Sequence, residues 1–366
     1  MPAKRIQIIL TREMVQTAKR QIEQVRVVRD QASAVDTLTG ILGEYVFALY
    51  FYGDWRFNRV TQNRGKSDFP HIEIKTSAFP YSDKLNLLVR EEYASRREPP
   101  FYVQIIIDTP NARPSDIQPG MRALIAGFAT HEEVSGAPLG EFGAKEGFSG
   151  NYLCHYIPLS RLHPMNEFPT AYCGYLWGEC QTQISGWPVP LKSLGNPNLL
   201  KEPSVAIFSS RGIPPGYKKE IFKAIQNLAQ LPNPLISSWH SQLEQHLQKQ
   251  RRPENGGIIF LTSREPDKSR LSPTVIPFFG WHNALLLQLP PKSTSKSGWF
   301  EQRNQLIMQI AKKVVFLYVR PSGMVEDLLK LSLQLGKIVY VVDIIPNRRW
   351  IKPPVRPLSA EIAFSI

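Results

Sequence analysis

The chain has 366 residues, of which 42% are hydrophobic and 20% charged. This composition is typical of a globular protein and excludes wholesale disorder, and the length predicts two domains. The 44 Lys and Arg residues outnumber the 31 Asp and Glu residues, which gives a formal net charge of +13. Such a surplus favours a polyanionic partner, either nucleic acid or an anionic membrane surface.

Cysteine content and hydropathy limit the cellular compartment and the binding partner that we expect for this protein. Three cysteines are too few for a disulfide framework, so we expect a reducing, cytoplasmic environment. We expect no secretory signal, because the first residues lack its long apolar run. The longest apolar stretch, residues 40–55, carries Glu44 and is too short to span a bilayer. Nucleic acid, and not a membrane, is therefore the expected partner.

The first half of the chain is predicted to contain two helices followed by several strands. Apolar residues recur at helical spacing between Met14 and Val25, and a second helix is predicted from Thr37 to Tyr52. Short apolar runs then predict strands at residues 56–61, 72–77, 85–90, 101–108, 122–129 and 151–159.

From residue 204 onward the pattern changes to short, nearly continuous apolar runs, several of them followed by helical segments. Alternation of this kind is typical of βα units with a parallel sheet that is buried on both faces. The preceding stretch is rich in proline and is typical of a linker. We therefore predict an α/β protein with domains at residues 1–190 and 204–366, joined by a linker at residues 191–203.

The segment from Asp68 to Lys75 has a pattern that suits a metal-dependent active site. On a strand, Glu73 and Lys75 point to the same face about 6–7 Å apart, while their apolar neighbours face a core. Asp68 lies five residues before Glu73, on the other face of a regular strand. Pro70 between them predicts a turn or bulge that returns Asp68 to the same side.

Two carboxylates and an ammonium at one strand end suit phosphodiester hydrolysis. Asp68 and Glu73 would hold Mg²⁺, which prefers hard oxygen ligands, and Mn²⁺ could substitute for it. Lys75 would orient the attacking water and offset charge on the phosphorane. Glu44 lies in a helix that is apolar nearly all round, where a carboxylate without a partner is costly, so it is a candidate third metal ligand.

These residues resemble the signature of the PD-(D/E)xK nuclease family, the fold of many restriction enzymes. Asp68, Glu73 and Lys75 match the motif, and Glu44 takes the position of the family's helical acid. The proline follows the aspartate here, whereas the family signature has it before. The resemblance covers roughly residues 35–165 and implies a restriction-endonuclease-like α/β/α core. The alternative is an ordinary amphipathic edge strand, because Glu-x-Lys is common by chance.

Three basic residues lie in the loop beside the acids, namely Arg59, Arg64 and Lys66. We expect them to contact the DNA phosphates that flank the scissile bond. The alternative for each of them is a solvated turn.

A second group of turns and strands is similar to the DNA-processing protein A family, which belongs to the Rossmann-like domains that bind nucleotides or DNA. The matching residues are Ser209-Ser210-Arg211, Pro290-Pro291, Phe300, Arg303-Asn304, Val314 to Val319, Ser322-Gly323 and Ile338 to Val342. The resemblance covers about residues 203–345 and implies a doubly wound parallel sheet.

The turn at Ser322 and Gly323 is predicted to bind an anion. Free backbone N–H groups and the positive end of a helix gather where a parallel strand gives way to a helix. Arg211 and Arg303, with Asn304 beside it, are expected at the same edge of the sheet, where ligands of open α/β sheets bind. The expected ligand is a phosphate of DNA or of a small nucleotide.

One departure from that family bears on the choice of ligand. Its glycine-rich turn after the second strand is replaced by Trp239 and His240. This change argues against a deep dinucleotide pocket and favours DNA. Trp239 is expected either to stack on a base or to pack in the core. The spacing of Cys173 and Cys180 does not match a structural zinc site.

The sequence as a whole predicts a Mg²⁺-dependent DNA endonuclease that a C-terminal DNA-binding domain directs or licenses, in defence against foreign DNA or in DNA processing. A homodimer is expected if both strands are cut. One alternative is a non-catalytic DNA-binding or loading factor that uses the nuclease fold as a scaffold. The other is an effector nuclease that a nucleotide messenger switches on by binding in the C-terminal domain.

Overall fold

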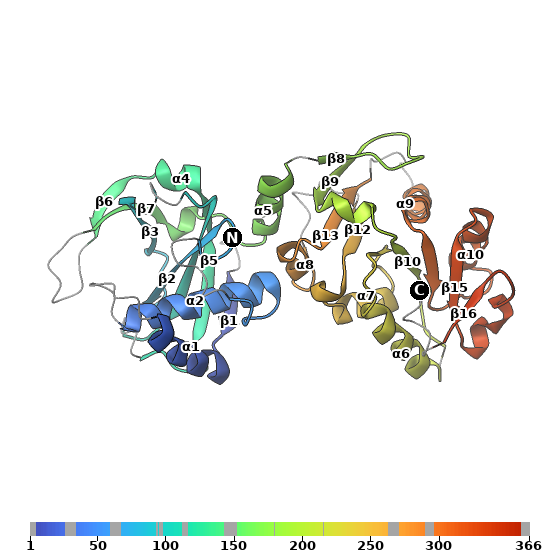
Figure 1. The fold of residues 1–366 in the computed structure, drawn as a ribbon, viewed down its shortest axis with the longest axis horizontal. Coiled ribbons are helices and arrows are strands. Elements are labelled where there is room, and N and C mark those ends of the chain that lie inside the picture. Colours follow the sequence, from blue (N-terminus) through green and yellow to red (C-terminus); the bar gives the residue numbers. More distant parts are fainter. Residues whose placement is uncertain are drawn as a thin grey trace. The chain divides into compact units, whose positions relative to one another are not determined.

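The computed structural model describes residues 5–25, 34–58, 67–92, 94, 98–111, 116–142, 152–178, 180–214, 216–262, 271–289 and 296–359. The chain divides into two compact units, Met1–Phe168 and Pro169–Ile366, and the elements of each are shown in Figure 1. Both units are α/β, as the apolar patterns predict. None of the described helices combines the length and hydrophobicity needed to cross a membrane.

The first unit is built on a four-stranded sheet in the order β1-β5-β4-β2. The edge strand β2 (Ile72–Phe79) pairs in parallel with β4 (Phe101–Asp108). Antiparallel pairing adds β5 (Arg122–Thr130) and then β1 (Ile6–Ile9). The predicted strand with Glu-x-Lys is therefore confirmed and lies at an edge of the sheet.

Two helices, α1 (Arg12–Val25) and α2 (Ala34–Tyr52), pack on each other, and α2 also packs on β2. Because α2 is apolar nearly all round, it buries side chains both toward α1 and toward the sheet. Its inner face contributes to a cluster of edge-packed aromatic rings formed by Phe47, Phe51, Phe101, Phe128 and Phe168.

A second, three-stranded antiparallel sheet has the order β3-β7-β6, with β3 at Asn86–Arg90, β7 at Tyr152–Pro158 and β6 at Leu139–Phe142. The short helix α4 (His131–Ser135) and the 3₁₀ turn η2 (Leu159–Arg161) accompany it. Alternate residues of β3 are buried against β4 and β5, so one face of this sheet covers the four-stranded sheet.

The second unit contains a nine-stranded sheet in the order β16-β15-β14-β10-β11-β12-β13-β9-β8. Seven strands are parallel: β10 (Val205–Phe208), β11 (Leu235–Ser237), β12 (Ile258–Thr262), β13 (Ala284–Gln288), β14 (Lys313–Phe316), β15 (Ile338–Val342) and β16 (Arg356–Leu358). The antiparallel strands β9 (Leu191–Gly195) and β8 (Cys180–Thr182) extend the edge beyond β13.

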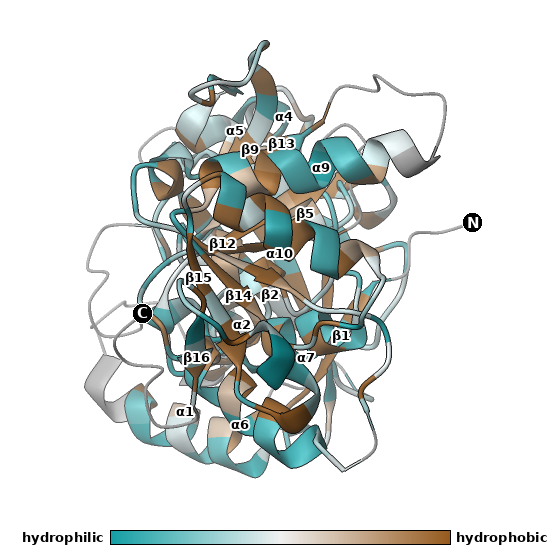
Figure 2. Cartoon of the chain, turned by 90° about the vertical axis from the view of Figure 1, so that its right-hand side faces the viewer, coloured by the Kyte–Doolittle hydropathy of each residue, from teal (hydrophilic) through white to brown (hydrophobic). Residues whose placement is uncertain are grey.

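Helices cover both faces of this sheet. Successive residues of β10 enter two different hydrophobic clusters, one with α6 (Lys218–Ala229), α7 (Gln242–Gln250) and α8 (Ile276–Gly280), the other with α9 (Lys296–Ile310) and α10 (Met324–Gln334). The remaining elements are α5 (Phe168–Trp177), η3 (Pro197–Leu200), η4 (Pro253–Asn255) and η6 (Ile345–Trp350). Figure 2 shows hydrophobic strands between helices that turn hydrophilic faces outward.

The winding of the sheet reverses beside β10. From β10 the chain adds β11, β12 and β13 on one side, and it then returns to place β14, β15 and β16 on the other. The predicted doubly wound sheet is thus present. In such sheets, ligands bind outside the carboxyl ends of the strands at the point of reversal, which here lies between β10 and β14.

The structure revises the predicted domain boundary. The division falls between Phe168 and Pro169, and residues 191–203, predicted as a linker, form β9 and η3 of the second unit. The prolines of this stretch, Pro197 and Pro203, lie outside β9, and Pro197 begins η3, a position where a missing N–H removes no hydrogen bond. Gly195, at φ 100°, permits its backbone to approach the carbonyl of Ala284 in β13 too closely for a side chain.

Candidate functional site

A tight turn returns Asp68 to β2. Two backbone hydrogen bonds of 3.0 Å close the turn, and its central residues are Pro70 and His71. His71 has φ 67°, the sign that the third position of a type II turn requires after a proline in the second. Asp68 Oδ2 then accepts a hydrogen bond of 2.8 Å from the backbone N–H of Ile74. Asp68 therefore lies alongside the outer edge of β2.

Glu73 and Lys75 leave β2 on the same face and form an ion pair. The distance from Lys75 Nζ to Glu73 Oε1 is 2.9 Å. The side chain of Glu73 is 8% exposed, whereas that of Lys75 is 23% exposed. A phosphate in solution can therefore reach the ammonium of Lys75, while the carboxylate behind it holds that ammonium in place.

A close helix–strand contact adds Glu44 to this group. At Gly43, α2 approaches β2 so closely that a side chain would overlap Thr76. Burial raises the pKa of Glu44 well above its usual range, and the charges of Asp68 and Glu73 raise it further. Glu44 Oε2 is buried and has no hydrogen-bond partner among the described residues. The three carboxylates therefore lie around one strand edge, beside the lysine.

The carboxylates of Glu44, Asp68 and Glu73 are hard oxygen donors of the kind that Mg²⁺ prefers. Within the described part of the chain, no three His, Cys, Asp or Glu side chains form a preassembled metal cluster. Mg²⁺ does not require one, because it commonly binds through one or two carboxylates together with waters and substrate phosphates. The buried, unpartnered Oε2 of Glu44 is an atom that a cation would satisfy. Glu44, Asp68 and Glu73 therefore fit this metal. The predicted phosphate contacts Arg59, Arg64 and Lys66 lie outside the described residues.

The contact at Gly43 makes a testable prediction about stability. Gly43→Ala is expected to lower the free energy of unfolding by about 1–3 kcal/mol, because the added methyl group overpacks the interface with Thr76. Gly40→Ala is the matched control, since nothing lies within 4 Å of a side chain there. It should raise stability by about 0.4–1 kcal/mol. Urea unfolding measures both, and equal effects would contradict the close contact.

Glu44 predicts a specific pH dependence. Because its pKa is raised in the folded state, the stability it contributes is present at acid pH, below the pKa of the unfolded chain, and is lost as the pH rises through the folded pKa. Glu44→Gln should remove this loss, so its melting temperature should exceed that of the wild type near neutral pH. A metal ligand at this position also predicts loss of Mg²⁺-dependent activity. A lower melting temperature at every pH would indicate a structural acid instead.

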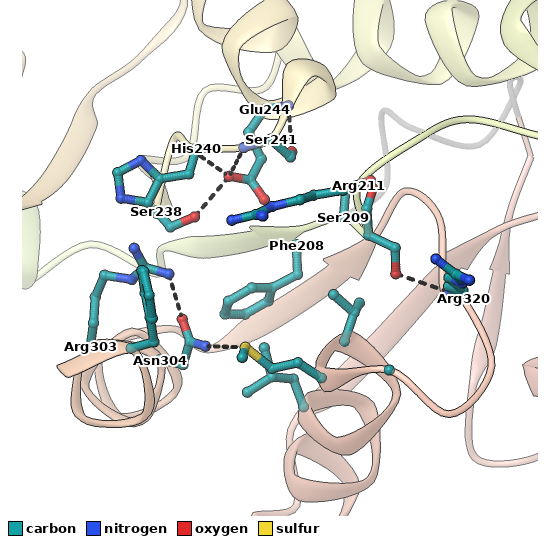
Figure 3. Close-up of a pocket in the computed structure, with 16 residues that line it drawn as sticks. Phe208, Ser209, Arg211, Ser238, His240, Ser241, Glu244, Arg303, Asn304 and Arg320 are labelled. Atoms are coloured by element: carbon teal, nitrogen blue, oxygen red, sulfur yellow. Dashed lines mark hydrogen bonds between the residues drawn. The ribbon is translucent and has the colours of Figure 1, made fainter. Parts of the chain in front are cut away.

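A second candidate site opens at the carboxyl ends of β10 and β14. It is a cavity of about 360 Å³, shown in Figure 3. Its walls come from the loops that follow β10, β11 and β14 and from helices α7, α9 and α10. The lining residues are Phe208, Ser209, Ser210, Arg211, Ser238, His240, Ser241, Glu244, Phe300, Arg303, Asn304, Arg320, Gly323, Met324, Val325 and Leu328.

Arg303 is a buried cation at the wall of this cavity. It is 5% exposed, and its Nε and Nη1 atoms have no hydrogen-bond partner among the described residues. Nη2 donates to Asn304 Oδ1 at 3.3 Å, and the guanidinium lies 5.0 Å and 5.1 Å from the rings of Trp299 and Phe300. Burial lowers the pKa of Arg303 to about 10, and Glu244 opposes this shift. At neutral pH the group remains charged and suited to an anion.

Two further arginines and a helix terminus surround the same cavity. Arg211, in the loop after β10, extends into it from another wall than Arg303 (Figure 3). Arg320 follows β14, and its backbone N–H donates to Ser210 Oγ at 2.9 Å, which ties two of the loops together. Gly323 is the N-cap of α10 and lines the cavity. Positive charge and a helix N-terminus therefore converge, as anion sites require.

Ser322 does not take its predicted place in the anion site. It is absent from the cavity lining, and its backbone N–H donates to Glu326 Oε2 at 2.7 Å. The first-turn carboxylate of α10 thus satisfies a donor that the sequence assigns to a ligand. Of the predicted anion-binding residues, the cavity brings together Arg211, Arg303, Asn304 and Gly323.

Glu244 shapes the loop after β11. Its Oε2 accepts hydrogen bonds from Ser238 Oγ at 2.9 Å and from the backbone N–H of His240 at 3.0 Å. Burial lowers the pKa of His240, and the positive charges of Arg303 and Arg211 lower it further, against the raising effect of Glu244. His240 therefore stays neutral at physiological pH and leaves the arginines as the cations of the cavity.

Trp239 belongs to the core and does not stack on a base. It is 7% exposed, and its indole N–H donates to the carbonyl of Ile259 at 3.1 Å. Its φ of 54° is unusual for a bulky residue.

Arg320 and Glu244 line the cavity without having been predicted from the sequence. Their positions just after β14 and at the start of α7 are the signal that would have revealed them.

No protein-family model and no curated protein matches the chain. Among solved structures, it is similar to DNA processing protein A from Streptococcus pneumoniae, with 18% identity and a TM-score of 0.39 over 47% of this chain and 64% of that one. It is also similar to DNA processing protein A from Helicobacter pylori, which binds single-stranded DNA, with 20% identity and a TM-score of 0.36 over 44% and 74% of the two chains. The molybdenum cofactor carrier protein from Chlamydomonas reinhardtii matches with 12% identity and a TM-score of 0.31 over 43% and 91%.

These similarities concern the fold alone. The match spans less than two thirds of the Streptococcus pneumoniae chain, 64%.

Proposed function

We propose that the chain is a metal-dependent DNA nuclease that hydrolyses phosphodiester bonds at the outer edge of β2. The observation that carries this proposal is the convergence of Glu44, Asp68 and Glu73 beside Lys75. In an ordinary edge strand, nothing favours a buried helix carboxylate next to two further carboxylates, because each adds a desolvation or repulsion cost. Such a cost is typical of a catalytic site.

Each residue then has a defined task. Mg²⁺, when bound by the carboxylates, supplies a Lewis acid and a water of lowered pKa. Glu73 holds the ammonium of Lys75 through the 2.9 Å ion pair, and Lys75 stabilises the negative charge that develops on the phosphate. The hydrogen bond from Ile74 fixes the carboxylate of Asp68 at the strand edge.

The alternative of a non-catalytic scaffold is less consistent with this geometry. A DNA-loading factor has no need for the three carboxylates and Lys75 to gather at one place. The raised pKa of Glu44, caused first by burial and then by the charges of Asp68 and Glu73, is consistent with three acids close to one another. Proximity of this kind favours the enzyme.

The second unit would hold a phosphate of the same DNA. Arg303 supports this role, because a buried guanidinium with two unpartnered N–H groups gains most from an anionic ligand. Arg211 and Arg320 lie in the same cavity. Its volume of about 360 Å³ is at the small end of the range for ligand pockets, about 300–1,000 Å³, and suits a single nucleotide unit. A free nucleotide messenger is the alternative ligand.

Incubation with circular and linear DNA tests the nuclease directly. We expect cleavage with Mg²⁺ or Mn²⁺ and none with chelator. Cleavage of the circle would identify an endonuclease, because a closed circle has no ends. The nuclease proposal would be contradicted if circular DNA, linear duplex and single-stranded DNA all stayed intact with Mg²⁺ and with Mn²⁺. DNA binding that persisted under those conditions would favour the scaffold alternative.

A further inference from the structure

The three-stranded sheet β3-β7-β6 has one face that packs on the core and another on which most side chains remain partly exposed. On β3, Leu87 and Val89 are 0% and 1% exposed and pack in the cluster shared with β4 and β5. Leu88 and Arg90 alternate with them and therefore point to the opposite face. The register pairs Leu88 with Tyr156 of β7, so Tyr156 shares that opposite face.

Two more aromatic residues lie on this face. Tyr152 is four residues from Tyr156 on the same strand, and the register pairs it with Phe142 of β6, so all three side chains point the same way. The rings of Phe142 and Tyr156 make an edge contact with 5.5 Å between centroids. The guanidinium of Arg90 lies 3.6 Å from the centroid of Tyr152. We refer to Phe142, Tyr152, Tyr156 and Arg90 as the aromatic face.

A glycine fits this arrangement of the rings. At Gly140 of β6, a β carbon would lie 3.2 Å from a ring atom of Phe142 and 3.2 Å from one of Tyr156. Glycine weakens a strand interior and commonly marks a close approach. Here it lets both rings lie near the strand backbone. All three aromatic residues remain partly exposed to solvent.

The aromatic face adjoins the carboxylate cluster. Cys154 lies on it, paired with Arg90 in the register, and is 5% exposed. Burial raises the pKa of the Cys154 thiol, and the positive charges of Arg90 and Lys75 both lower it. Strand β3, which carries Arg90, contacts β2, which carries Lys75, and the charges of both cations act on this one thiol. A strand whose phosphate lies at Lys75 would pass this face with its neighbouring nucleotides.

We propose that the aromatic face stacks unpaired nucleobases, and that the substrate of the nuclease is single-stranded or locally unpaired DNA. This inference rests on the proposed function and names the substrate class of the same site. Aromatic side chains stack on any base, because every base has a π face, and in a duplex those faces are already stacked. Sheets that present aromatic residues to single strands are a known solution in nucleic-acid recognition. Arg90 and Lys75 pair with Glu92 at 3.7 Å and with Glu73 at 2.9 Å, and both remain partly exposed cations that a phosphate backbone can contact.

The test uses the full chain in chelator, so that binding is measured without cleavage. A fluorescent single strand and its duplex are titrated with the wild type and with Tyr152→Ala and Tyr156→Ala. We expect tighter binding of the single strand, and about tenfold weaker binding for each alanine variant, which corresponds to about 1.4 kcal/mol. Duplex affinity should change little. Tyr152→Phe and Tyr156→Phe, which keep the rings, should bind like the wild type.

Tyr81→Ala is the matched control. Tyr81 is also partly exposed and also carries an arginine near its ring, Arg5 at 5.0 Å, but it follows the far end of β2 from Lys75. A local readout complements the affinities: photo-crosslinking of a strand with iodinated uracil should label peptides that contain Tyr152 or Tyr156.

Equal affinity for single strand and duplex, or losses in the two alanine variants no larger than in Tyr81→Ala, would overturn the inference. So would crosslinks that lie only outside this sheet, as expected if the face contacts a protein or a second copy of the chain. These measurements need no cleavage. A failure of the nuclease proposal can therefore be told apart from a failure of this inference about single-stranded DNA.

Discussion

Lys75→Ala is expected to reduce Mg²⁺-dependent DNA cleavage by about 10²–10³-fold, the range for removing one group that stabilises charge in the transition state. The ammonium lies 2.9 Å from the buried carboxylate of Glu73 and is itself partly exposed, so its charge is accessible to a phosphate that arrives from solvent. Binding of DNA in chelator should survive, because other cations of this basic chain remain. Gel assays of cleavage and titrations of a labelled strand measure the two effects separately.

Two variants make this result interpretable. Lys84→Ala removes an exposed lysine of the same unit and should cleave like the wild type. Lys75→Arg keeps a positive charge beside Glu73 and should fold normally, yet it should lose much of the activity, because a planar guanidinium places its charge differently. Wild-type cleavage by a folded Lys75→Ala protein would refute the assignment of this site.

Arg303→Met is expected to weaken DNA binding and to stabilise the fold at the same time. Burial lowers the pKa of Arg303 to about 10, and its Nε and Nη1 atoms have no hydrogen-bond partner among the described residues, so the cost of burying this cation is poorly compensated and opposes folding. Replacing buried charged groups by apolar ones of similar volume stabilises proteins by about 1–4 kcal/mol in favourable cases. The plot of log affinity against log salt should flatten by about one unit of slope, because one phosphate contact is lost.

Arg251 provides a matched control, because it is equally buried but fully engaged. It is 3% exposed, and its guanidinium donates to backbone carbonyls, including that of Asn233 at 2.7 Å and that of Gly257 at 3.3 Å. Arg251→Met should therefore lower the free energy of unfolding by about 1–3 kcal/mol, the cost of leaving buried acceptors unsatisfied, and leave the salt dependence of DNA binding unchanged. The same loss of stability in Arg303→Met would show that Arg303 is structural. Thermal melts and salt titrations of DNA binding distinguish this structural role from a phosphate-binding role.

A free nucleotide in the cavity predicts a different pattern. The wild type would then gain thermal stability with a mononucleotide by the mass-action term for binding to the native state. Arg303→Met would lose that gain, and its DNA affinity and salt slope would match those of the wild type.

Much of the fold could be predicted from local patterns. Strands β2, β3, β4, β5 and β7 and the βα alternation after residue 204 appear where apolar periodicity places them. The predicted strand at residues 56–61 is not found in its described part, where Phe57 donates a backbone hydrogen bond to Asp54 in a turn. A short apolar run does not distinguish a strand from a turn that buries aromatic rings.

Some site residues could be predicted from their position in the chain, and others could not. Arg211, Arg303 and Gly323 follow or flank strands of a parallel sheet, so the fold class alone brings them to one edge. The prediction for Ser322 is wrong because the carboxylate of Glu326, four residues later, accepts the hydrogen bond from its backbone N–H. That competition depends on side-chain conformation, which residue spacing does not specify.

The sequence alone determined the class of each unit and the shared face of Glu73 and Lys75, because strand alternation is a local property of the backbone. Only the tertiary structure decided that Glu44 reaches these residues, since that depends on how closely α2 meets β2 at Gly43. It also decided that the Pro-rich stretch forms strand β9, which pairs with β13 and β8, and the turn η3, and that the guanidinium of Arg303 is buried. Strand pairing and burial are contacts between residues far apart in the chain, and local propensity does not encode them.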